Sequence, residues 1–146
     1  MTAEKRIMGI DYGSVRIGIA VSDPLHIIAQ GITAVRNTER AVSEVIGFVL
    51  QYDIGLIIVG MPYNLKGEEG QKAEEVNRFI TQLKAQCPAE IITLDERFTS
   101  SIAQQTLREM GTTKKQRRTD KGRVDAMAAA LILQQFLDKT KHSKGC

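Results

Sequence analysis

Short apolar runs along the chain predict five β-strands. Most of the runs end at glycine or aspartate, and some alternate between apolar and polar positions, as strands do. The predicted strands are residues 6–11, 17–22, 30–35, 56–59 and 90–94. A short turn joins the first two strands, so we expect them to form an antiparallel hairpin.

Other segments place apolar residues three and four positions apart, which is the pattern of an amphipathic helix. They predict helices over about residues 39–50, 71–86, 100–110 and 124–137, the first with Thr38 as its N-cap. Three opening strands followed by alternating helices and strands predict an α/β fold. Its five-stranded mixed sheet is antiparallel for the first three strands and parallel for the last two, with about four flanking helices. Right-handed crossovers should place the first and fourth strands together at its centre.

The composition fits one domain. The chain has 146 residues, of which 42% are hydrophobic and 25% charged, and domains most often have about 100–150 residues. We expect one domain over residues 1–139 and a flexible tail over residues 140–146. The two cysteines, Cys87 and Cys146, exclude a disulfide framework and indicate a reducing, cytoplasmic location. No apolar run approaches the roughly 18 residues of a membrane span, so no membrane partner is expected.

Charge is distributed unevenly along the chain. Residues 1–96 hold 9 Lys/Arg and 13 Asp/Glu, whereas residues 97–146 hold 11 Lys/Arg and 4 Asp/Glu. A basic C-terminal third favours a polyanionic partner such as nucleic acid, although a basic loop in solvent would give the same count. The residues expected to bind phosphates are Arg97, Lys114, Lys115, Arg117, Arg118, Lys121 and Arg123.

Four carboxylates lie where strands end or a helix begins. Asp11 ends the first strand, Asp95 and Glu96 follow the fifth, and Asp125 heads the apolar stripe of the last helix. Taken singly, each carboxylate has another explanation. Asp11 could cap a turn, Asp95 or Glu96 could pair with Arg97, and Asp125 could interact with the helix dipole. Together they match the carboxylates from separate elements that two-metal phosphodiester hydrolysis with Mg²⁺ or Mn²⁺ needs. Only one of Asp95 and Glu96 can face such a site, because neighbours in a strand point to opposite faces.

Four motifs in order resemble one known family. They are IDYGS with RIGIA at residues 10–14 and 16–20, GMP at 60–62, DERFT at 95–99 and VDAMAA at 124–129. Over residues 6–137 the chain resembles the YqgF/RuvX family of the ribonuclease H-like superfamily. Members of this family are described as nucleases of the 16S ribosomal RNA precursor and also as Holliday junction resolvases.

The resemblance implies a bacterial, cytoplasmic nuclease that acts in 5′ maturation of 16S ribosomal RNA. It places the catalytic and metal-binding site on Asp11, Glu96 and Asp125, with Asp95 as the alternative ligand, and implies two Mg²⁺ or Mn²⁺ ions. The implied partners are structured pre-16S RNA, the ribosome precursor or branched DNA, bound by a monomer or a weak homodimer. One departure concerns the fourth strand, since related resolvases commonly end it with an acidic residue and this chain has Gly60 there.

Three other functions stay open at this point. The first is cleavage of branched DNA, and the second is a non-catalytic RNA- or ribosome-binding module that keeps the nuclease fold. The third is nucleotide binding, because residues 11–14 also resemble the first phosphate loop of actin-like ATPases and sugar kinases. Those proteins need two such domains, and this chain has the length of one.

Overall fold

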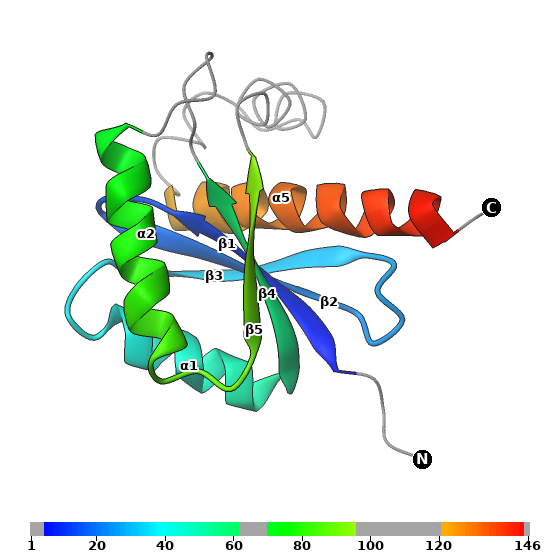
Figure 1. Ribbon diagram of the computed structural model, residues 1–146, viewed down its shortest axis with the longest axis horizontal. Coiled ribbons are helices and arrows are strands. Elements are labelled where there is room, and N and C mark those ends of the chain that lie inside the picture. The colour runs from blue at the N-terminus through cyan, green and yellow to red at the C-terminus, as the bar shows by residue number, and fades with distance from the viewer. Residues whose placement is uncertain (1–4, 62–69, 96–120, 145–146) are drawn as a thin grey trace.

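The computed structural model describes residues 5–61, 70–95 and 121–144. Within these ranges the chain forms five strands and three helices (Figure 1). The elements are β1 Arg6–Tyr12, β2 Arg16–Ser22, β3 Ala29–Arg36, α1 Ala41–Gln51, β4 Ile54–Met61, α2 Gln71–Lys84, β5 Glu90–Asp95 and α5 Lys121–Lys144. The helix expected over residues 100–110 lies outside the described residues.

The five strands form one mixed sheet in the order β3-β2-β1-β4-β5. β1 pairs antiparallel with β2 and parallel with β4, and β2 pairs antiparallel with β3. β4 and β5 are parallel. The predicted α/β fold is therefore confirmed, including the opening hairpin and the pairing of the first and fourth strands at the centre.

The ends of two helices differ from the prediction. The first helix begins at Ala41 and its N-cap is Arg40. Thr38 instead closes a turn, in which its Oγ1 accepts a hydrogen bond from the Arg40 N–H (3.2 Å) and its carbonyl accepts one from Ala41. The last helix continues to Lys144, so residues 140–144 are helical where a flexible tail was predicted. The helix can continue past residue 139 because no proline or glycine interrupts residues 123–144.

Helices cover both faces of the sheet (Figure 1). On one face, α1 and α2 pack against Met8, Ile10, Ile57 and their neighbours in the larger core. On the other face, α5 lies against β1, β2 and β3, where Leu133 packs with Ile7 and other residues in a second core. Among the described helices, none combines the length and apolarity that crossing a membrane requires.

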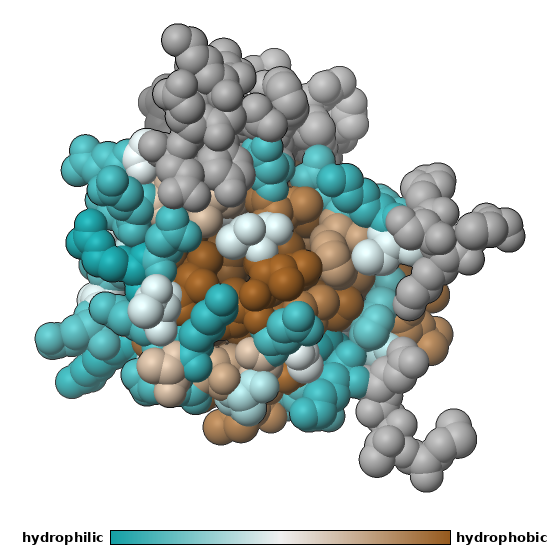
Figure 2. All heavy atoms as spheres, in the orientation of Figure 1, coloured by the Kyte–Doolittle hydropathy of each residue, from teal (hydrophilic) through white to brown (hydrophobic). Residues whose placement is uncertain are grey.

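The partly buried apolar residues on the α5 side of β4 and β5 are Leu56, Ile92 and Leu94. Figure 2 shows hydrophobic side chains gathered at the centre of the molecule, in the region of these two strands, with hydrophilic residues around them. α5 contacts β4 less extensively than it contacts β1, β2 and β3. The helix is thus displaced toward the β3 edge, and this displacement sets where its N-terminus lies.

Glycines let α5 approach the sheet closely. A Cβ at Gly9 would lie 2.7 Å from Leu133 Cβ, and one at Gly31 would lie 2.9 Å from the Ala126 carbonyl oxygen. At Gly18, a Cβ would overlap the carbonyl oxygen of Asp125. Glycine at these positions therefore seats the first turns of α5 directly on β2 and β3, with Asp125 above β2.

Substituting Gly18 by alanine is expected to destabilise the fold by on the order of 2 kcal/mol, because the new methyl group meets backbone rather than a movable side chain. Urea denaturation of the purified variant measures this loss. Gly47→Ala is the matched control, since Gly47 lies inside α1 with open space around it and alanine favours the helix by about 1 kcal/mol. Equal stability of the two variants would contradict the close seating of α5.

Candidate active site

The candidate site lies where β1 ends and β2 begins. Asp11 is the penultimate residue of β1 and pairs across the ladder with Gly18. Partners in a ladder share a face, and Gly18 lies under the backbone of Asp125. Asp11 therefore lies on the face of the sheet that carries the N-terminal end of α5.

The carboxyl group of Asp11 has a strongly shifted pKa. Burial raises the pKa of Asp11 from 3.8 to about 6, the positive charge of Lys72 opposes this shift, and the negative charge of Asp125 adds to it. Asp11 and Asp125 are thus close enough for their charges to interact. Two carboxylates from different elements therefore lie near each other on one face, and their role as metal ligands stays a prediction.

Arg16 holds Asp125 in place. Its Nε donates a hydrogen bond to Asp125 Oδ2 at 2.7 Å, and the two side chains are 31% and 25% exposed. This ion pair joins residues 109 positions apart. Arg16 lies two residues before Gly18 on β2, so strand alternation places both on the α5 side. Sequence reasoning quoted Arg16 only as part of a motif, and the alternation with Gly18 was the signal that could have revealed its role.

The turn before Arg16 is fixed by the residue that follows β3. The side-chain amide of Asn37 donates to the Gly13 carbonyl (2.8 Å), and its backbone N–H donates to the Val15 carbonyl (2.9 Å). These bonds restrict how the hairpin can move relative to β3. They therefore position the first residue of β2, and with it the partner of Asp125.

Asp95 lies on the other face of the sheet. It ends β5 and pairs with Met61, which packs in the core between the sheet and the helices α1 and α2. Asp11 and Asp125 are on the α5 side, so the structure does not bring Asp95 together with them. Glu96, the preferred neighbour, lies outside the described residues.

The other predicted residues divide into two groups. Lys121 and Arg123 are in the first turn of α5 and are exposed. The rest lie outside the described residues, namely Arg97, Lys114, Lys115, Arg117 and Arg118. Sequence reasoning missed Lys72, the second residue of α2, whose charge acts on Asp11.

Asp11 and Asp125 provide the type of ligand that a hard divalent cation requires. Carboxylate oxygens suit Mg²⁺ and Mn²⁺, and a bound cation would offset both the burial of the Asp11 charge, which is the main cause of its raised pKa, and the repulsion from Asp125. Within the described part of the chain, no cluster of three or more His, Cys, Asp or Glu side chains is placed to hold a metal. The described pair fits such an ion in the chemistry of its oxygens, and a third protein ligand would come from outside the described residues.

Comparison with known proteins identifies the family. The RuvX family model, described as Holliday junction resolvase, matches residues 5–139. A protein of Sulfurihydrogenibium sp. named "Putative pre-16S rRNA nuclease" is 41% identical over 140 residues, covering 94% of this chain and 93% of that protein. One of the same name from Natranaerobius thermophilus is 40% identical over 136 residues, covering 92% and 94%.

Solved structures of resolvases share the fold. RuvC of T. thermophilus in complex with a Holliday junction substrate matches with a TM-score of 0.56 and 13% identity, covering 94% of this chain and 96% of that one. The fowlpox virus Holliday junction resolvase matches with a TM-score of 0.53 and 14% identity, covering 92% and 99%. These likenesses confirm the ribonuclease H-like fold. The sequence matches confirm the resemblance read from the four motifs: the chain belongs to the RuvX family.

Proposed function

We propose that this protein is a divalent-metal-dependent nuclease that hydrolyses phosphodiester bonds in 5′ processing of the 16S ribosomal RNA precursor. The observation that carries the proposal is the meeting of Asp11 and Asp125 on one face, where the pKa of Asp11 is raised to about 6. The relatives named for pre-16S rRNA support RNA as the substrate. A cytoplasmic location remains a prediction.

Three carboxylates would hold the metal in this proposal. Asp11 and Asp125 supply two of them, and Glu96 supplies the third. Strand alternation supports Glu96 over Asp95, because Asp95 shares a face with Met61 and the following residue of a continuing strand would turn to the α5 side. When bound, Mg²⁺ or Mn²⁺ would supply an activated water and charge stabilisation at the leaving oxygen.

The remaining residues of the site would orient the carboxylates and bind the substrate backbone. Arg16 fixes the side chain of Asp125 through its 2.7 Å hydrogen bond and offsets its charge. Lys121 and Arg123 lie in the same turn of helix as Asp125 and are exposed. They would neutralise phosphates next to the scissile one, together with Arg97, Lys114, Lys115, Arg117 and Arg118.

Cleavage of branched DNA is the second candidate function. The family model is described as Holliday junction resolvase, which is the observation that favours it. A four-way junction is cut symmetrically by two active sites, so this function would need a homodimer with its sites suitably spaced. A monomer or a weak homodimer, as predicted, suits a precursor-RNA nuclease better.

Cleavage of two substrates by the purified chain tests the proposal. With Mg²⁺ or Mn²⁺, a 16S precursor fragment carrying its 5′ extension should be cut faster than a four-way DNA junction, and EDTA should stop the reaction. Faster cutting of the junction would favour the resolvase function. Binding of the RNA without cleavage of either substrate would indicate the non-catalytic module and would overturn the proposal.

A further inference from the structure

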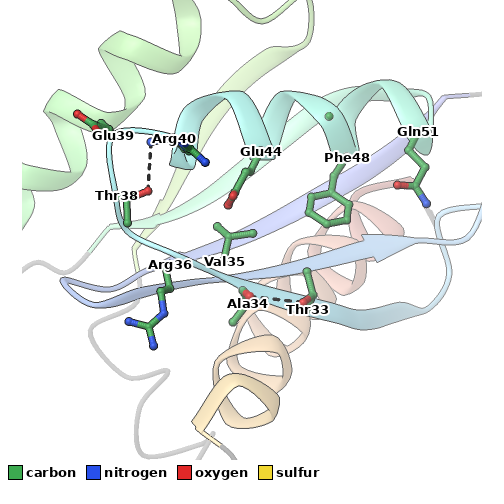
Figure 3. Close-up of a pocket in the computed structure, with 11 residues that line it drawn as sticks. Thr33, Ala34, Val35, Arg36, Thr38, Glu39, Arg40, Glu44, Phe48 and Gln51 are labelled. Atoms are coloured by element: carbon green, nitrogen blue, oxygen red, sulfur yellow. Dashed lines mark hydrogen bonds between the residues drawn. The ribbon is translucent and has the colours of Figure 1, made fainter.

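Basic side chains continue from the carboxylates toward the edge of the sheet. Arg16 and Arg36 are partners in the antiparallel ladder between β2 and β3. Partners project to the same face, and the ion pair of Arg16 with Asp125 shows that this is the α5 face. In Figure 3, Arg36 accordingly points away from α1, on the side of the sheet where α5 lies.

Arg36 is available to an external ligand. Its side chain is exposed at the end of β3, which is an edge strand. Among the residues that the structure describes, no carboxylate forms an ion pair with it. Strands in a sheet are about 4.8 Å apart, so Arg36 lies roughly 10 Å from the strand of Asp11, and its long side chain can shorten the distance to a phosphate near the scissile one.

A groove begins beside Arg36 and follows β3. It has a volume of about 520 Å³ and lies between residues 31–34 of β3 and the first two turns of α5. The α5 side is formed by Gly122, Arg123, Ala126 and Met127. The described residues that line the groove include no acidic and no aromatic side chain, so it suits a phosphate backbone without stacking of bases.

The other described directions away from the site offer no excess of positive charge. On the opposite side, β4 ends without a charged side chain and β5 ends at Asp95. A larger hollow of about 920 Å³ lies between β3 and α1 (Figure 3), where Glu39 and Glu44 balance the charges of Arg36 and Arg40. Both carboxylates would repel a polyanion. The α5 side of β3 is therefore the described route that combines positive charge, from Arg36 and Arg123, with space.

We propose that the substrate strand leaves the carboxylate site across β2 and β3, with Arg36 bound to a backbone phosphate beside the scissile one. The groove between β3 and α5 accommodates the nucleotides that follow. The identity of the ligand as a nucleic-acid strand rests on the proposed function. The binding mode itself requires no cleavage. Arg36 lies outside the basic segment that precedes Asp125, and Arg123 of that segment lines the groove.

Binding of a single-stranded 16S precursor oligonucleotide in EDTA tests this proposal. Arg36→Gln is expected to weaken binding several-fold at 0.15 M salt and to reduce the slope of log K against log salt by about 0.7, the value for one phosphate contact on a single strand. Arg36→Lys should keep the slope, because the charge remains. An unchanged thermal midpoint would show that the Gln variant is folded.

Arg78→Gln is the matched control. Arg78 is also an exposed arginine, but it lies on α2, on the opposite face of the sheet, and its loss should leave the slope unchanged. Equal slopes for the Gln variants of Arg36 and Arg78, or wild type that does not bind the oligonucleotide, would overturn the proposal. The binding assay contains no divalent ion, so its result does not depend on cleavage. Failure of cleavage in the separate nuclease assay would therefore not count against the proposed binding route.

Discussion

Asn in place of Asp11 or Asp125 is expected to reduce divalent-dependent cleavage at least about a hundredfold while the chain stays folded. Loss of an outer partner of a metal ligand typically costs 10–100-fold, and loss of the ligand itself costs more. Initial rates with Mn²⁺ measure the effect. Asp53→Asn is the matched control, because Asp53 lies just before β4, at the opposite end of the sheet. Its positive φ of 54° also suits asparagine.

The neighbours at the end of β5 extend this prediction. Glu96→Gln should lose activity as severely as the Asp11 variant, whereas Asp95→Asn should have the milder effect because Asp95 shares a face with Met61. The reverse order would show that Asp95 is the ligand and that the strand does not continue regularly past it. Full activity of either the Asp11 or the Asp125 variant would contradict the proposed metal site.

The Asp11→Asn variant should also be more stable than wild type in EDTA at pH 7. The pKa of Asp11 is about 6 in the folded chain against an ordinary 3.8, so folding favours the protonated form. Wild-type stability therefore falls as the pH rises from about 4 to about 6. At pH 7 the ionised group costs up to about 3 kcal/mol of unfolding free energy, which asparagine avoids.

Urea denaturation at pH 4 and pH 7 measures this difference. The two proteins should be similar near pH 4 and diverge as the pH rises, while Asp53→Asn should show no such divergence. Mg²⁺ should then narrow the gap at pH 7 by stabilising wild type more than the variant, because a ligand stabilises the state that binds it. A gap that does not change with pH would show that Asp11 is not buried beside Asp125.

Much of the fold could be predicted because it depends on local patterns. The apolar runs and the short turn before Arg16 are enough to predict the hairpin. The alternation of helices and strands after it is enough to predict a mixed sheet. Helix ends were less certain, because they depend on single turns such as the one that Thr38 closes. The extension of α5 to Lys144 follows from the absence of a breaker rather than from its apolar stripe.

The site could be predicted only in part. Asp11 and Asp125 could be proposed as its carboxylates because such residues are unusual at a strand end and at the head of an apolar stripe. The ion pair between Arg16 and Asp125 depends on strand register and on how closely α5 packs against Gly18, and both are long-range properties. The sequence alone does not show which face of the sheet Asp95 is on, because that depends on its pairing with Met61.

A crystal structure of the protein soaked in Mn²⁺ tests the central claim most directly. Anomalous scattering should show an ion with carboxylate oxygens of both Asp11 and Asp125 at about 2.1–2.2 Å, near the distance of octahedral divalent ions of this kind. A side-chain oxygen of Glu96 should complete the protein ligands. Anomalous density that is absent from both aspartates at saturating Mn²⁺, or that lies on Asp95 instead, would contradict the proposed site.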